Sequence, residues 1–301
     1  LGRLRCRPLT TGPAEGIAWR MLLAPAIVPW LVVLYDLAGI PFTRGSLFAA
    51  SVVLLIAGFA AQRPGFLLGR VVWSTAPRAG PVAAAVVGAP AATPTTGRAP
   101  GAAGLFRSPA ASVLAVTAGT LVLMSIVQVA ILPDRNYDAN VGFGLVGKIL
   151  AAEGKLRSSV FDRIVYNAQA VYAPFTSANY GFGYLFFEEV PRLWVPWLLA
   201  GFLLALGSWV RRYTGSATIA ALTAFLVLLP QALLTQGATD ARPDLPSMIY
   251  IVFAALAVAD IFLGRGGYGA PAMLLLVAST ARAENVLFGA ALATAVFLVR
   301  P

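Results

Sequence analysis

Long apolar runs recur along this chain, and they constrain its fold more than any other feature. Of its residues, 59% are hydrophobic and 11% are charged, and the mean hydropathy is +0.80. About a quarter of the residues in a soluble domain are charged, whereas an apolar helix of about 20 residues can span a bilayer. The sequence therefore predicts an all-α polytopic membrane protein. Six spans are expected: Met21–Ile40, Ser46–Ala61, Ser112–Leu132, Leu193–Val210, Ala217–Leu234 and Ser247–Leu263.

Two shorter apolar runs close the chain. Ala270–Ala278 and Val286–Val299 flank a polar break at Ser279–Asn285. The first run makes about 14 Å of helix at about 1.5 Å per residue, which is too short to cross a bilayer alone. It is either a half-span or a helix extended by its polar ends, so we expect seven or eight transmembrane helices.

Composition divides the chain into three parts. Residues 1–62 form an N-terminal two-helix membrane segment, and residues 63–108 form a basic linker rich in Pro, Gly and Ala. Residues 109–301 form the transmembrane core. Because the chain starts at Leu1 and stops at Pro301 directly after an apolar run, we expect the N-terminal fragment of a longer protein.

The arginines predict the orientation in the membrane. Residues 1–20 carry four Arg and one Glu, and residues 62–108 carry five Arg and no acid. Arg211, Arg212 and Arg265 fall on the same side if every span crosses. Cytoplasmic loops carry the excess of basic residues, so we expect this side to face the cytoplasm in the cytoplasmic membrane. The net charge of +10 is scattered between spans, which favours membrane orientation over a nucleic-acid partner.

The segment 133–192 is then a large outer loop, and it holds six of the twelve acidic residues. Within it, Val141–Glu153 has helical apolar spacing, with Asp138 at an N-cap position and Gly154 at the C-terminal glycine position. We expect a short helix lying on the outer membrane surface. The aromatic stretch 166–187 is expected to rest at the headgroup level.

The chain has no histidine and one cysteine, Cys6. A Ser-His-Asp triad, a His-ligated zinc and a His proton shuttle are therefore excluded for these residues. Acid–base chemistry falls to Asp, Glu, Lys or Tyr.

Asp134 and Asp138 are the first candidates for such chemistry. A carboxylate at the membrane edge is partly desolvated, which raises its basicity and suits it to act as a general base. The competing interpretation is structural, because Asp138 suits a helix cap. Their four-residue spacing would also allow both carboxylates to bind one divalent cation.

Asp244, Arg282 and Glu284 form the second group of candidates. Asp244 precedes Leu245 and Pro246 at the start of a span, where it could simply cap the helix. Arg282 lies between two apolar runs on the outer side, where charge is costly and marks function by default. Its planar fork can donate two parallel hydrogen bonds to a phosphate. The alternative is an internal Arg282–Glu284 pair that steadies a helical hairpin.

The order of these features resembles the GT-C class of integral-membrane glycosyltransferases, which includes protein mannosyltransferases and aminoarabinose transferases. A span leads into an outer loop with Tyr137 and Asp138, and an amphipathic stretch and an aromatic segment follow. Asp244-Leu-Pro and the stretch from Thr280 to Glu284 come later. The resemblance covers about residues 110–301. It departs from the class in having two spans before the loop and Arg282 where Lys is common.

The resemblance implies transfer of a sugar from a polyprenyl-phosphate donor to an acceptor hydroxyl on a glycan, lipid or protein, at the extracytoplasmic face. Asp138 would act as the base with Asp134 as the fallback, and Arg282 would stabilise the departing lipid phosphate. Tyr137, Asp244 and Glu284 would assist substrate binding. Two rival hypotheses are a transporter with these residues along its path, and a non-catalytic membrane scaffold.

Overall fold

The computed structural model describes residues 13–62, 108–132, 138–156, 158–160, 173–188, 191–230, 241–263 and 268–299. Helices dominate the described residues, and no strand occurs among them. The helices are α1 (Pro13–Ala38), α2 (Arg44–Gln62), α4 (Pro109–Ile131), η2 (Asp138–Phe143), α5 (Gly144–Glu153), α6 (Phe175–Phe186), α7 (Trp194–Thr214), α8 (Ala217–Leu228), α9 (Asp244–Phe262), α10 (Gly269–Ala281) and α11 (Asn285–Val299). The all-α class is confirmed over these ranges. The linker 63–108 lies outside them, apart from Ser108.

Four of the described helices are long and apolar enough to cross a membrane: α1 from Glu15 onward, α4, α7 and α9. Shorter apolar helices are found in α2, α8, α10 and α11. These helices support a membrane protein, and each of them overlaps an apolar run of the sequence. The count of seven or eight spans and the large outer loop stay predictions.

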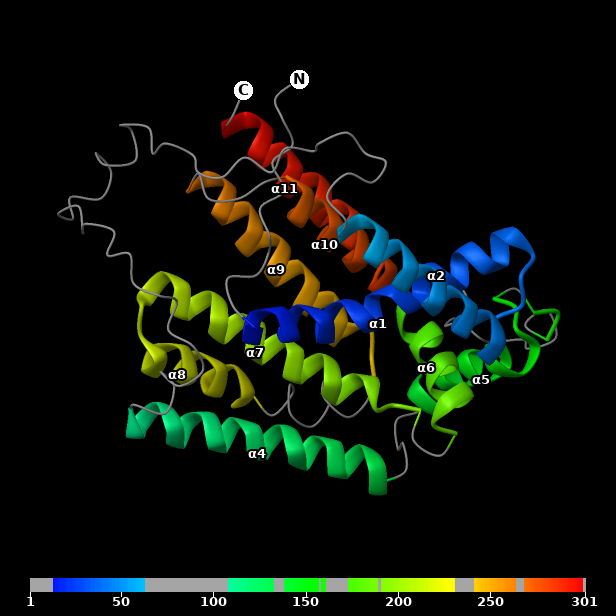
Figure 1. Ribbon diagram of the computed structural model, residues 1–301, viewed down its shortest axis with the longest axis horizontal. Helices are drawn as coiled ribbons and strands as arrows, with labels where there is room; N and C mark the ends of the chain where they lie inside the picture. The colour runs from blue at the N-terminus through cyan, green and yellow to red at the C-terminus, as the bar shows by residue number, and fades with distance from the viewer. Residues whose placement is uncertain are drawn as a thin grey trace.

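The long helices α1 and α4 and the shorter helix α8 pack against α7 (Figure 1). On one side α7 contacts α8 and α4, and on the other it contacts α1. Helices α9, α10 and α11 form a second group above α1 in Figure 1, while α5 and α6 cluster at one end of the molecule. The N-terminal helix α1 is thus packed within the main bundle, a contact that the division of the sequence at residue 62 does not predict.

Aromatic rings join α6, α7 and α9 in the core. The ring of Phe175 packs edge-on against Trp194 and Tyr250, with centroids 5.8 and 5.7 Å apart. The Tyr250 hydroxyl is buried and donates a hydrogen bond of 2.6 Å to the Leu22 carbonyl of α1. A buried tyrosine needs such a partner for its hydroxyl, so this contact fixes α1 against α9.

Helix α1 contains two prolines, and a side chain from α6 compensates for one of them. Pro29 has no N–H to donate to the carbonyl of Pro25. The buried Asn179 amide donates to that carbonyl at 3.0 Å and to the Phe175 carbonyl at 2.8 Å. Asn179 therefore restores a backbone partner that the sequence of α1 removes.

The structure of helix α6 differs from one expectation about the aromatic stretch 166–187. Its described part is a helix whose residues from Phe175 to Gly181 are buried among other helices, and it does not lie across a surface. Helix α5 passes close to α6 at Gly147, where an added Cβ would lie 2.4 Å from the Tyr180 Cβ. Phe175 and Tyr180 thus lie in the protein interior, whereas Phe186 at the end of the helix is 44% exposed. The headgroup position stays a prediction for that end.

The predicted short helix is present, with a different start. Helix α5 ends at Gly154, whose φ of 70° is left-handed and whose N–H donates to the Leu150 carbonyl at 2.8 Å. This end is confirmed. Asp138 does not cap α5, because the π-helical turn η2 begins at Asp138 and the capping position falls on Phe143.

The sequence position of Arg192 suggests a solvated residue at the start of α7. In the structure Arg192 instead has a structural role. Its side chain is buried, and its Nη2 donates to the Leu132 carbonyl at 2.6 Å. The last carbonyls of a helix lack partners within the helix, and Arg192 supplies one at the end of α4. Glu188, four residues earlier, is exposed.

Candidate functional site

Two of the predicted residues meet where α9 begins and α10 ends. Arg282 Nη1 lies 3.0 Å from Asp244 Oδ1, and their side chains are 39% and 57% exposed. The residues are far apart in sequence, and the alternation of spans predicts that they share one side of the membrane. Their contact confirms that these two residues come together.

Asp244 does not cap α9. The helix begins at Asp244 itself, and Pro243 at the capping position makes no side-chain cap. Because Pro243 and Pro246 flank the first turn, the helix can start without a polar cap. The Asp244 carboxylate instead faces Arg282, and an acid in the first turn is also favoured by the helix dipole.

Arg282 occupies the joint between α10 and α11. Its backbone is extended, with φ −145° and ψ 133°. Its N–H donates to the Ala278 carbonyl at 3.1 Å, and its own carbonyl accepts from the Asn285 N–H at 3.1 Å. Both backbone polar groups are thereby held, so the guanidinium extends from a fixed point.

Glu284 is not the ion-pair partner that the alternative interpretation gave to Arg282. The guanidinium pairs with Asp244, and Glu284 lies exposed in the turn directly before α11. An arginine paired across helices ties the α9 start to the α10 end. A pair with Glu284 would have been local to the hairpin.

The sequence interpretation missed a buried polar cluster beneath this pair. Asn285 Nδ2 donates to the Ala278 carbonyl at 2.7 Å and to Ser247 Oγ at 2.9 Å, and all three groups are buried. Ser247 belongs to the first turn of α9. The sequence carries one signal of this cluster, a polar residue at the edge of each apolar run. A solvated turn gives the same signal.

The electrostatics of Arg282 favour an anion. A guanidinium has five N–H donors and no acceptor. One donor bonds Asp244, and the buried Nε finds no hydrogen-bond partner among the residues described. Nε is buried and out of reach of a ligand, but the Arg282 side chain as a whole is 39% exposed. An anion can therefore approach the guanidinium from solvent, and a phosphate oxygen is an acceptor that suits its fork.

The remaining predicted residues are placed in part. Asp138 is the first residue of η2, whereas Asp134 and Tyr137 lie outside the described residues. Phe143 at the end of η2 shares one hydrophobic cluster with Leu245 and Ala281, the neighbours of the ion pair. Helix α6 contacts both η2 and α10. The segment that begins at Asp138 and the Asp244–Arg282 pair therefore adjoin the same core cluster.

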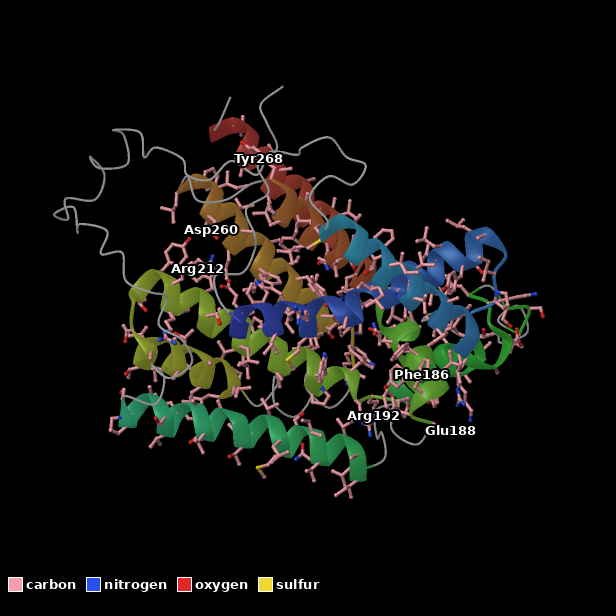
Figure 2. All side chains as sticks on the ribbon, in the orientation of Figure 1. Phe186, Glu188, Arg192, Arg212, Asp260 and Tyr268 are labelled. Atoms are coloured by element: carbon pink, nitrogen blue, oxygen red, sulfur yellow. The ribbon has the colours of Figure 1, made fainter. Side chains whose placement is uncertain are left out.

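A second ion pair marks the opposite end of the bundle. Arg212, in the last turn of α7, contacts Glu15 near the start of α1. Figure 2 shows Arg212 and Asp260 at one end and Phe186, Glu188 and Arg192 at the other. Arg212, one of the arginines predicted to face the cytoplasm, thus lies at the other end of the molecule from Glu188 and Arg192 of the segment predicted to be outside (Figure 2).

The spacing of Asp134 and Asp138 allows a divalent cation to bind them. Over the described ranges, no three His, Cys, Asp or Glu side chains gather as a metal-binding group.

Comparisons with models of known protein families, with curated proteins and with solved structures found no match to this chain.

Proposed function

We propose that this chain acts as an integral-membrane glycosyltransferase. It takes a sugar from a polyprenyl-phosphate donor and moves it to an acceptor hydroxyl on a glycan, lipid or protein. The reaction occurs at the extracytoplasmic face of the cytoplasmic membrane, within a core of seven or eight spans. The observation that carries the proposal is the half-exposed Arg282 side chain, which pairs with Asp244 and has further guanidinium N–H donors for an anion.

In the proposed reaction Arg282 binds the phosphate of the lipid donor. The acceptor hydroxyl gives its proton to the Asp138 carboxylate, and its oxygen attacks the anomeric carbon. The bond from that carbon to the phosphate oxygen breaks, and the electron pair leaves with polyprenyl phosphate. One displacement inverts the anomeric carbon. Arg282 stabilises charge that grows on the leaving phosphate, which is where a fixed donor accelerates a reaction.

The other residues have supporting roles in this proposal. Asp244 orients the Arg282 guanidinium through their ion pair. Asp134 is the fallback base, and Tyr137 and Glu284 contact the sugar or the acceptor. A divalent cation, if used, would be held by Asp134 and Asp138, since carboxylate oxygens suit hard cations.

The proposal is tested in membranes that contain the expressed chain and radiolabelled polyprenyl-phosphate sugars. We expect Arg282→Gln to lower transfer by about 10²–10³-fold, as for loss of a donor to a developing anion. Asp138→Asn is expected to lower it by about 10²–10⁴-fold. Arg20→Gln is the matched control, because it removes the same charge at an exposed position that has no role in the proposed reaction, and it should cost far less.

Undiminished transfer in Arg282→Gln would overturn the role of this arginine. Undiminished transfer in Asp138→Asn would move the base to Asp134. If the wild type transfers sugar from none of the donors, the glycosyltransferase proposal is wrong, and transport of an anion past Arg282 becomes the leading hypothesis.

A further inference from the structure

The buried cluster beneath the ion pair has no place in the reaction so far. Asn285 is 3% exposed, and its amide joins three helices. It donates to Ser247 Oγ in α9 and to the Ala278 carbonyl in α10, while it forms the first residue of α11. Its Oδ1 also lies 3.2 Å from Ser247 Oγ.

These hydrogen bonds involve groups that lie close in the chain to the two residues of the ion pair or that bond to them. Ser247 lies three residues after Asp244, one turn along the same helix. The Ala278 carbonyl accepts from the Asn285 amide at 2.7 Å and from the Arg282 N–H at 3.1 Å. A carbonyl oxygen has two lone pairs, so the two bonds are compatible. The Asn285 side chain thus holds the acceptor that fixes the Arg282 backbone.

We infer that Asn285 is the positioning residue of the anion site. Its amide locks the start of α9 to the end of α10, and this lock sets where the Arg282 guanidinium lies relative to Asp244. Asn285 is buried beneath the pair, so it acts through Arg282. The consequence for phosphate binding rests on the proposed function, whereas the positioning of Arg282 does not.

The burial of the cluster makes it sensitive to single substitutions. In a low-dielectric interior, hydrogen bonds are strong and an unpaired polar group is costly. Removing the amide leaves Ser247 Oγ and the second lone pair of Ala278 without this partner. The joint between α10 and α11 then loses its tie to α9, and the guanidinium gains freedom.

The test measures the reactivity of Arg282 towards phenylglyoxal, an arginine-selective reagent, in the full chain in detergent micelles. Peptide mass spectrometry reports the rate at Arg282 relative to the exposed Arg20. We expect Asn285→Ala and the isosteric Asn285→Asp to raise this rate by about three- to tenfold, the equilibrium shift that one lost hydrogen bond gives. Ser247→Ala should raise it less, because the Ala278 bond remains.

Asn179→Ala is the matched control. Asn179 is also buried and also donates two amide hydrogen bonds, to carbonyls of α1 and α6. Its loss destabilises the fold without touching the α9–α10–α11 joint. An unchanged Arg282 rate in both Asn285 variants, or an equal rise in Asn179→Ala, would overturn the inference. Should Asn285→Ala fail to fold, Asn285→Asp and Ser247→Ala decide the question in the same assay.

A second arm separates this inference from the proposed function. Decaprenyl phosphate should slow the reaction at Arg282 in the wild type, and the uncharged alcohol decaprenol should not. The protecting concentration should rise about tenfold in Asn285→Asp. If decaprenyl phosphate gives no protection while the Asn285 variants still expose Arg282, phosphate binding is wrong and the positioning role stands. Equal protection in every variant would limit Asn285 to a structural role.

Discussion

Among the described residues, the pairs Glu15–Arg212 and Asp244–Arg282 each join two helices at opposite ends of the bundle, and their surroundings differ. Glu15 is 4% exposed and Arg212 is 31% exposed, with 2.5 Å between Oε1 and Nη2. At the other end Asp244 is 57% exposed and Arg282 is 39% exposed, at 3.0 Å. Both pairs join helices that are distant in sequence, so their topological roles are alike.

The difference lies in what each pair can still bind. The Glu15 carboxylate is enclosed, so the pair serves to hold α1 against α7. The Asp244–Arg282 pair is open to solvent, and exposed pairs contribute little to stability. The phosphate ligand of the proposed function is therefore assigned to the open pair. Stability should therefore depend on the first pair and anion binding on the second.

The largest expected effect is on stability at the enclosed pair. Arg212→Met leaves the buried Glu15 carboxylate without this guanidinium, and breaking a buried pair costs about 3–5 kcal/mol. We expect a loss near the lower figure, because Arg212 is partly exposed. Arg282→Met should cost less than about 1 kcal/mol. Unfolding titrations in denaturing detergent measure both. Arg211→Met is the control, since it removes the same charge from the same turn.

Equal losses of stability in Arg212→Met and Arg282→Met would break the comparison. The two pairs would then both be structural, and the argument for a ligand at Arg282 would lose its basis.

The next effect concerns the shape of the cation. Arg282→Lys keeps the charge and loses the planar fork that donates two parallel hydrogen bonds. We expect transfer from the polyprenyl-phosphate donor to fall about tenfold, between wild type and Arg282→Gln, because roughly one charge-assisted hydrogen bond is lost. Radiolabel transfer at matched expression measures it. A lysine variant as inactive as Arg282→Gln would mean that bidentate geometry outweighs charge.

A smaller effect is expected for the carboxylate of the open pair. Asp244→Asn keeps an oxygen that can accept from Arg282 and removes a negative charge that competes with phosphate. We therefore expect decaprenyl phosphate to protect Arg282 at about a threefold lower concentration, the size of an exposed electrostatic term. A tenfold weaker protection would instead make the Asp244 charge necessary for holding the guanidinium.

The sequence predicts the helices well because hydrophobicity is a local property. The end of α5 at Gly154 follows from a glycine after an apolar period, and the lengths of the runs predict α4 and α9. The alternation of spans predicts that one end of α9 and one end of α10 share a side of the membrane if the run 270–278 crosses, whereas the contact between Asp244 and Arg282 is shown only by the structure.

The buried contacts could not be predicted because each depends on a partner far along the chain. Asn179 bonds the Pro25 carbonyl 154 residues away, and Arg192 bonds the Leu132 carbonyl 60 residues away. In the sequence Arg192 is a charged residue next to an expected span, and Asn179 is a polar residue within the aromatic stretch. The aromatic residues of α6 fit a headgroup position and an interior position equally well, and packing alone decides between them. Asn285 was overlooked for the same reason.

The smallest expected effect is the response of the two pairs to salt. Raising the ionic strength from about 0.1 M to 1 M shortens the Debye length from about 10 Å to 3 Å, and it screens exposed charges more than buried ones. Double-mutant cycles of Glu15–Arg212 and of Asp244–Arg282, each measured by detergent unfolding at both salt concentrations, give the coupling energies. We expect the Asp244–Arg282 coupling to fall by a few tenths of a kcal/mol, roughly its whole value for an exposed pair, and the Glu15–Arg212 coupling to change little. An equal fall in both would mean that water reaches Glu15, and burial would then not distinguish the structural pair from the ligand-binding one.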